Sequence, residues 1–175
     1  MINYTPPQTH MRWKERLKAL LQEALKSDNP VVLVGIGNTL RGDDGIGVKI
    51  AEALKDSLEC SKIRVIVVED RVDMLGRFLG DLKPSLMIFF DAADFGGKPG
   101  EIRILDLAEA SGKTISTHLI PLDVILKVIG VASPSYVIGV QMMNIEFGGR
   151  ISEPVKVAGK MIVEFLEKEL ASICR

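Results

Sequence analysis

The stretch of residues 31–45 constrains the fold of this chain more than any other. It begins with an apolar, β-branched run over residues 31–34, which is typical of a strand buried in a parallel sheet. The run breaks into a glycine-rich loop that ends with Asp43 and Asp44. A helix is expected next, because apolar residues recur at helical spacing over residues 46–54. The sequence therefore predicts two carboxylates at the carboxyl end of a strand, where open α/β sheets place their sites.

This loop has two simpler interpretations. Gly35 and Gly37 suggest a dinucleotide-binding turn, but the third glycine comes five residues after Gly37 instead of three. The loop also presents Asp43 and Asp44 where a pyrophosphate needs bare N–H groups, which disfavours nucleotide binding. Asp43 is expected to be the N-cap of the following helix, because acids suit the positive end of a helix. That leaves Asp44 for another role.

Length and composition exclude several classes of protein. The 175 residues predict one core, and a net charge of −1 gives no reason to expect binding to nucleic acid or to an anionic membrane. Neither a membrane-spanning apolar run nor a signal-peptide core is present in the sequence, so we expect no insertion into a membrane. Cys60 and Cys174 lie far apart and match no metal or disulfide spacing, which favours a reducing, cytoplasmic setting.

Strand and helix patterns alternate along the chain. They predict an α/β fold, a three-layer sandwich in which a mostly parallel, twisted sheet of about five strands carries helices on both faces. We divide the chain into an N-terminal extension with an amphipathic helix (1–30) and a single α/β domain (31–175). The extension's helix is expected to pack on the domain and not to bind a partner. Besides the first strand, strands are expected at 63–68, 85–90, 101–105 and 136–141, and helices at 10–27, 46–54, 74–82, 118–129 and 154–170. The strand at 101–105 alternates polar and apolar residues, which indicates an antiparallel edge strand.

Acidic residues end three of the predicted strands. Because the carboxyl ends of parallel strands meet at one edge of a sheet, we expect these residues to form an acidic rim. Like charges brought close must be relieved by protonation or by a cation. The pairs are Asp43 and Asp44, Glu69 and Asp70, and Asp91 and Asp94.

His118 is the one histidine within the predicted α/β domain. It is expected at the start of a helix, with Ser116 and Thr117 as possible N-caps, where the helix dipole favours the neutral imidazole that metal binding requires. Considered by itself, His118 would be interpreted as an ordinary histidine at the start of a helix. Together with Asp44 and Asp91 it suits a divalent transition metal with open positions and metal-assisted hydrolysis, in which the metal polarises a carbonyl and activates a water. Nucleophilic catalysis fits less well, since the chain has no Gly-x-Ser-x-Gly elbow.

Three stretches resemble signatures of one enzyme family, the hydrogenase maturation endopeptidases. Residues 35–47 resemble that family's opening signature, and residues 91–94 followed by 98–103 are similar to its second. Residues 116–118 with Leu122 are similar to its third. Residues 99–102 (Pro-Gly-Glu-Ile) and 139–141 (Gly-Val-Gln) resemble sequences of the family branch that serves formate-hydrogenlyase-type hydrogenases.

The resemblance implies an activity and a set of site residues. It implies a cytoplasmic, monomeric endopeptidase that removes a short C-terminal peptide from the nickel-loaded precursor of a nickel–iron hydrogenase large subunit. It makes Asp44, Asp91 and His118 the metal-contacting, catalytic residues, with nickel carried by the substrate and not permanently bound. Asp70 receives no role, because Arg71 and Val72 follow it where family members often have glycines. The alternative is a non-catalytic chaperone that binds nickel or the precursor through the same rim.

Overall fold

The computed structural model describes residues 9–107, 115–116 and 122–173, and the statements below concern these residues. The helices, including two short 3₁₀ turns called η, are α1 (Thr9–Ala24), η1 (Gly42–Gly45), α2 (Ile46–Ser57), η2 (Val72–Met74), α3 (Leu75–Leu79), α5 (Leu122–Val128) and α6 (Glu153–Ala171). The strands are β1 (Val31–Ile36), β2 (Ile63–Glu69), β3 (Leu86–Asp94), β4 (Ile102–Asp106), β5 (Ile115–Ser116) and β6 (Ser135–Gln141).

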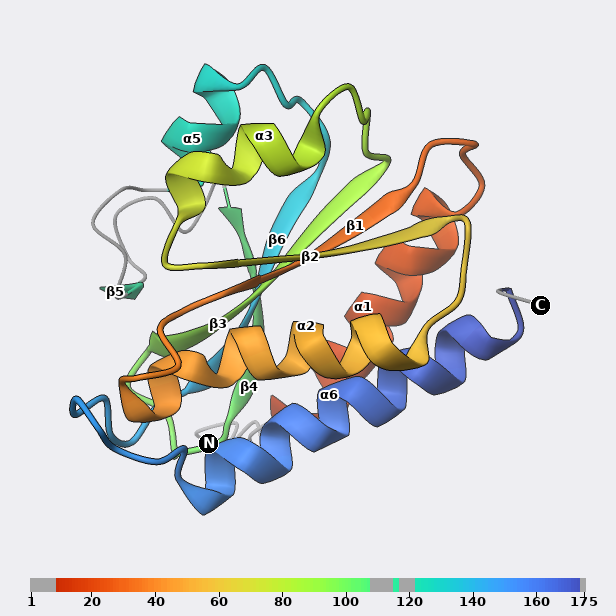
Figure 1. Ribbon diagram of the computed structural model, residues 1–175. Coiled ribbons are helices and arrows are strands. Elements are labelled where there is room, and N and C mark those ends of the chain that lie inside the picture. Colours follow the sequence, from red (N-terminus) through yellow and green to blue (C-terminus); the bar gives the residue numbers. More distant parts are fainter. Residues whose placement is uncertain (1–8, 108–114, 117–121, 174–175) are drawn as a thin grey trace, which may run out of the picture.

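The strands form one sheet in the order β2-β1-β3-β6-β4 (Figure 1). β1 pairs in parallel with β2 and β3, and β3 pairs in parallel with β6. β4 runs antiparallel to β6 at the edge of the sheet, as its alternating sequence predicts. The short β5 pairs antiparallel with β3 and was not predicted. The predicted α/β sandwich, with a mostly parallel sheet and an antiparallel edge strand, is therefore confirmed.

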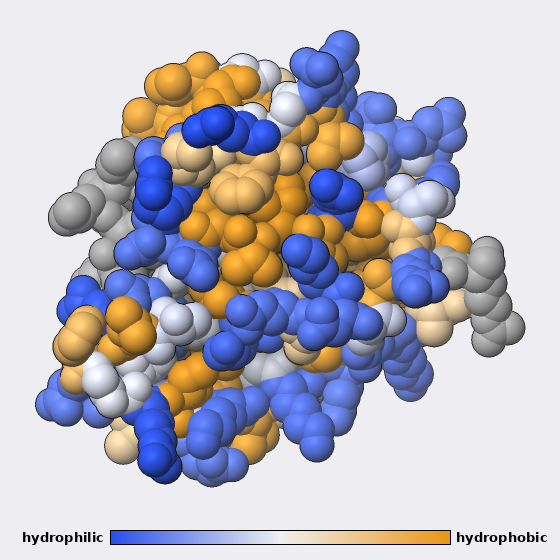
Figure 2. Space-filling model, viewed as in Figure 1, coloured by the Kyte–Doolittle hydropathy of each residue, from blue (hydrophilic) through white to orange (hydrophobic). Residues whose placement is uncertain are grey.

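Helices cover both faces of this sheet. Figure 1 shows α1, α2 and α6 on one face and α3 and α5 on the other. Successive side chains of a strand point to opposite faces, so Phe90 on β3 belongs to the core under α2 and α6 and Phe89 to the core under α3 and α5. Polar side chains cover the outer surfaces of α2 and α6 (Figure 2), as expected for amphipathic helices.

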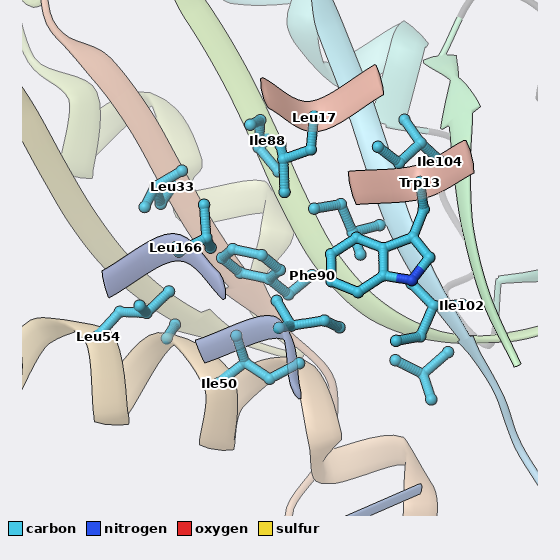
Figure 3. Packing of buried hydrophobic residues seen from close by; sticks show 14 of the residues in the cluster. Trp13, Leu17, Leu33, Ile50, Leu54, Ile88, Phe90, Ile102, Ile104 and Leu166 are labelled. Carbon is cyan, nitrogen blue, oxygen red and sulfur yellow. The ribbon is translucent and has the colours of Figure 1, made fainter. Parts of the chain in front are cut away.

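The N-terminal helix α1 belongs to the larger core. Trp13, Leu17 and Leu21 are buried on its inner face, as the apolar stripe predicts (Figure 3). The Trp13 ring meets that of Phe165 on α6 edge to face, with 5.3 Å between the ring centroids. Arg16 Nη1 donates a hydrogen bond of 3.0 Å to the carbonyl oxygen of Ile104 on β4. The prediction that this helix packs on the domain is confirmed, whereas the division of the chain at residue 30 stays a prediction.

Some predicted element boundaries are wrong. The helix predicted at 74–82 ends at Leu79, because Gly80 takes a left-handed conformation with φ of 54°. The strand predicted to end at residue 90 continues to Asp94, because β6 and β5 both pair with its last residues. Ser116 does not cap a helix, since its backbone pairs with Ala93 in the sheet. The helix predicted from His118 to about residue 129 is described over Leu122–Val128, and its predicted start lies outside the described residues.

The state of Cys60 bears on the expected compartment. Cys60 is disulfide-bonded, so the prediction of no disulfide is wrong. The cysteine pattern consequently no longer argues for a reducing setting. Among the described helices, none combines the length and the apolar character needed to cross a bilayer.

Candidate functional site

The loop that carries Asp44 is tightly folded. Asp44 lies in η1, just past β1, and only 3% of it is exposed. Its Oδ2 accepts a hydrogen bond of 3.0 Å from the backbone N–H of Asn38, which closes the loop on itself. Gly37 has a φ of 128°, and a Cβ atom there would lie 1.8 Å from the carbonyl oxygen of Asp44. Only glycine fits this turn, so the loop holds Asp44 in one place.

A second glycine brings this loop against the neighbouring strand. A Cβ atom on Gly47, in the first turn of α2, would lie 2.0 Å from the carbonyl oxygen of Phe90 and 2.4 Å from that of Ile36. The absence of a side chain therefore lets α2 sit directly against the carboxyl ends of β1 and β3. As a result η1, which precedes α2, contacts β3.

Asp91 lies on β3 immediately after Phe90. It is 2% exposed and is paired in the sheet with Gly139 of β6. The sequence predicted Asp91 just after a strand; it lies inside β3 instead, yet still near its carboxyl end. Asp44 and Asp91 are thus two buried carboxylates on neighbouring segments at the same edge of the sheet.

The third predicted residue, His118, lies outside the described residues. Within the described ranges, no group of three histidine, cysteine, aspartate or glutamate side chains is arranged to hold a metal ion. The structure places Asp44 and Asp91 on η1 and β3, two elements that contact each other. The complete set of Asp44, Asp91 and His118 stays a prediction.

Asp43 has a role that the sequence did not reveal. Neither η1 nor α2 has a side-chain N-cap, so the prediction that Asp43 caps the helix is wrong. Its carboxylate instead accepts hydrogen bonds from the backbone N–H groups of Met143, Asn144 and Ser152 at 2.6–2.9 Å, and from the Ser152 hydroxyl at 2.8 Å. Burial alone would raise the pKa of Asp43, but these donors together hold it below its usual range. Asp43 fixes the β6–α6 loop to the loop that carries Asp44.

The remaining acids of the predicted rim are more exposed. Glu69, at the end of β2, and Asp70 are both exposed, and Asn38 Nδ2 donates a long hydrogen bond of 3.5 Å to Asp70 Oδ2. Glu69 has a φ of 57°, which is strained for a residue with a side chain. The backbone N–H of Gly37 donates to the carbonyl oxygen of Glu69 at 3.1 Å, so β2 helps to hold the same loop.

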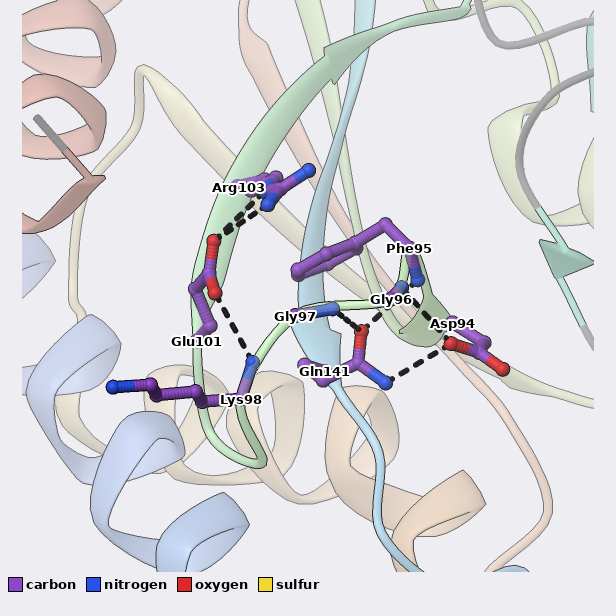
Figure 4. Close-up of polar contacts among 8 residues, drawn as sticks. All are labelled: Asp94, Phe95, Gly96, Gly97, Lys98, Glu101, Arg103 and Gln141. Carbon is purple, nitrogen blue, oxygen red and sulfur yellow. Dashed lines mark hydrogen bonds and ion pairs between the residues drawn. The ribbon is translucent and has the colours of Figure 1, made fainter. Parts of the chain in front are cut away.

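Gln141 holds the loop that follows β3 at this edge of the sheet. It was not identified from the sequence as a site residue. Its Oε1 accepts hydrogen bonds from the backbone N–H groups of Phe95 and Gly97, each at 3.0 Å, and its Nε2 donates to Asp94 Oδ1 at 3.1 Å (Figure 4). The Gln141 amide and the N–H of Gly96 lower the pKa of Asp94. A polar residue that ends a buried strand was the available signal, and it is the same signal that identified Asp91.

An ion pair and a stacked ring hold the β3–β4 loop. The Arg103 guanidinium lies 4.3 Å from the centroid of the Phe95 ring, and Arg103 Nη2 pairs with Glu101 Oε1 at 2.8 Å (Figure 4). Glu101 Oε2 also accepts a hydrogen bond of 3.2 Å from the backbone N–H of Lys98. The loop that follows β3 is therefore held by side-chain contacts of its own.

A hollow in the described surface lies elsewhere. It measures about 520 Å³ and lies beside the amino ends of β3 and β6. Its lining comes from the α3–β3 and α5–β6 connections and includes Gly80, Pro84 and Val131. Ligands of parallel sheets bind at the carboxyl ends of strands, so this hollow is not the candidate site.

Two buried carboxylates at one strand edge can perform two kinds of chemistry. They can supply oxygen ligands to a divalent metal, or one of them can accept a proton from an attacking water. Both uses suit the hydrolysis of a peptide bond.

Comparisons with known proteins identify the family. The family described as hydrogenase maturation protease (HycI) matches residues 48–169, more than half of the chain. The match begins after Asp44 and includes Asp91.

Individual relatives agree with this match. The crystal structure of a [NiFe] hydrogenase maturation protease HycI from Thermococcus kodakarensis is 30% identical, covers 87% of this chain and 99% of its own, and superposes with a TM-score of 0.72. The hydrogenase 3 maturation protease of Escherichia coli K12 is 28% identical over 142 residues, 78% of this chain and 88% of that protein. The hydrogenase expression/formation protein HupD of Thiocapsa roseopersicina is 30% identical over 162 residues, 81% of this chain and 70% of that protein. This chain therefore belongs to the hydrogenase maturation protease family and is a peptide hydrolase.

Proposed function

We propose that this enzyme removes a short C-terminal peptide from the nickel-loaded precursor of a nickel–iron hydrogenase large subunit. The observation that carries the proposal is the pair of buried carboxylates, Asp44 and Asp91, at the carboxyl edge of a sheet with this family's fold. Burying a charged carboxylate costs free energy unless the group is paired, and such groups are therefore often found where they take part in catalysis or bind a partner.

Each predicted site residue has a proposed role. Asp44 and Asp91 contact the metal through carboxylate oxygens and His118 through an imidazole nitrogen, a donor set that suits a divalent transition metal with open positions. Nickel arrives with the precursor, and when bound it polarises the carbonyl of the bond to be cut. The carboxylates orient the substrate and accept the proton of the attacking water. A three-residue, open-sided site recognises nickel without removing it from the precursor.

An enzyme fits better than a non-catalytic chaperone. The relatives from Thermococcus kodakarensis and Escherichia coli are both named as proteases. No observation on this chain favours the chaperone. We further propose that the enzyme acts in the cytoplasm and as a monomer, as the resemblance to this family implies.

The experiment compares processing by the wild-type enzyme with that by Asp44→Asn, Asp91→Asn and His118→Ala. Purified enzyme is incubated with nickel-loaded precursor, and the mass of the product is measured. The wild type should shorten the precursor, and each variant should slow processing by at least about 100-fold, because each loses a group that acts on the reacting bond. The asparagine variants keep the shape of the side chain, so circular dichroism should show an intact fold.

The matched control is Asp56→Asn, which makes the same change at an exposed position on α2. It should process the precursor as the wild type does. Full activity in the Asp44→Asn or Asp91→Asn variant would refute the site. A wild-type enzyme that binds the precursor without shortening it would favour the chaperone instead.

A further inference from the structure

Three large apolar side chains are exposed at the edge of the sheet that carries Asp44 and Asp91. They are Leu40, 60% exposed, in the loop between β1 and η1, and Met143 and Phe147, 67% and 79% exposed, in the loop between β6 and α6. We call these three residues the apolar rim. The two loops touch, because the backbone N–H of Gly148 donates a hydrogen bond of 2.8 Å to the carbonyl oxygen of Leu40. Apolar surface is visible at this end of the molecule, at the lower left of Figure 2.

The backbone under the apolar rim is fixed. The N–H of Met143 donates at 2.8 Å to the Asp43 carboxylate, and the N–H of Asp43 donates at 2.8 Å to the carbonyl oxygen of Asn144. The N–H of Leu40 donates at 2.9 Å to the side-chain oxygen of Asn38. These bonds keep the loops from folding their apolar side chains inward.

The apolar rim lies beside the candidate site. Met143 is bound to Asp43, the residue next to Asp44, so the apolar rim and the candidate site share one loop framework. A protein substrate whose peptide bond reaches Asp44 and Asp91 must also pass over the residues beside them. Preformed apolar side chains next to a binding site are where contact with a protein partner contributes most affinity.

We propose that the apolar rim binds an apolar surface of the precursor beside the bond that is cut. This inference rests on the proposed function and adds to it the surface through which the enzyme recognises its protein substrate. Burying Leu40, Met143 and Phe147 against apolar side chains of the precursor supplies binding free energy away from the reacting bond. The rim therefore affects the binding of the precursor and not the chemical step.

The test compares Phe147→Ser with Phe78→Ser. Phe78 is 48% exposed on α3, a helix that ends beside the amino end of the sheet, so the control makes the same chemical change away from the site. Initial rates of processing are measured over a range of concentrations of nickel-loaded precursor. Phe147→Ser should raise KM at least about fivefold with kcat unchanged, the loss expected when an apolar side chain buried in an interface is removed. Phe78→Ser should leave both constants as in the wild type.

Binding is measured separately from cleavage. Asp44→Asn and the double variant Asp44→Asn/Phe147→Ser are titrated with the precursor by calorimetry, and the double variant should bind at least about fivefold more weakly. If the wild type leaves the precursor uncut, the proposed function fails. If the wild type cuts but Phe147→Ser matches Phe78→Ser in KM and affinity, only this inference fails. A wild-type dimer that Phe147→Ser converts to a monomer would assign the apolar rim to a second copy of the chain and overturn the proposal.

Discussion

At the scale of single residues, the neighbouring acids Asp43 and Asp44 have different hydrogen-bond partners. Both Asp43 and Asp44 are buried, but Asp44 accepts a hydrogen bond within its own loop, whereas Asp43 binds a loop about 100 residues further along the chain. The difference lies in their donors. Asp43 accepts hydrogen bonds from three backbone N–H groups and a hydroxyl of the β6–α6 segment, whereas Asp44 accepts one from the backbone N–H of Asn38 in its own loop.

Replacing Asp43 should destabilise the fold. Asp43→Asn puts an amide NH₂ group among backbone donors, so we expect the free energy of unfolding to fall by about 1–3 kcal/mol at pH 7. Urea unfolding followed by circular dichroism measures this difference. Asp73→Asn, at an exposed position in η2, is the control and should change the free energy by less than about 0.5 kcal/mol.

The same residue predicts a pH dependence. The folded-state pKa of Asp43 lies below its ordinary value of 3.8, so its contribution is present above that value and is lost as the pH falls through the folded-state pKa. The stability difference between the wild type and Asp43→Asn should therefore shrink below about pH 4. A difference that stayed constant from pH 7 to pH 3 would mean that the hydrogen bonds do not depend on the charge.

At the scale of elements, the close contact of α2 with the sheet decides where the site forms. The helix begins directly against the ends of β1 and β3, which requires glycine at position 47. The 3₁₀ turn before it carries Asp44 to β3, where Asp91 lies.

Adding one methyl group at this contact should separate the helix from the sheet. Gly47→Ala would place Cβ against two carbonyl oxygens that belong to the sheet backbone and cannot move aside, so we expect a loss of at least about 3 kcal/mol and weaker processing of the precursor. Gly76→Ala on α3 is the control, because its nearest neighbour is the Ile129 side chain at 3.1 Å. Equal stability of the two variants would show that α2 can shift without cost.

At the scale of the whole molecule, α1 completes the core between α6 and β4. Trp13 is 2% exposed and contacts Phe165, so the helix contributes to the same apolar cluster as Phe90 and Ile104. The chain therefore folds as one cooperative core over that face of the sheet.

Truncating Trp13 should destabilise the whole molecule. Trp13→Ala should lower the free energy of unfolding by about 3–5 kcal/mol, since it leaves a large cavity. Trp13→Phe should cost much less, because it keeps the ring and removes an indole N–H that has no partner among the described residues. Thermal unfolding measures both, with Val128→Ala, 80% exposed on α5, as the control. If Trp13→Ala behaved like Val128→Ala, α1 would not belong to the core in solution.

Local sequence determined much of this protein. The β-branched run of β1, the helical stripes of α1 and α6, and the alternation in β4 are signals between near neighbours, so strand and helix positions followed from them. Acids at the ends of buried strands located the edge with Asp44 and Asp91, because parallel strands align their carboxyl ends.

Only the tertiary structure decided the long-range partnerships. Nothing near Asp43 in sequence indicates that it binds Met143 and Ser152, and nothing near Gln141 indicates that it holds the turn after Asp94. The extension of β3 to Asp94 depends on pairing with β5 and β6. Such contacts join segments that meet only when the sheet assembles, and for that reason their geometry is set by the fold as a whole and not by the residues on either side.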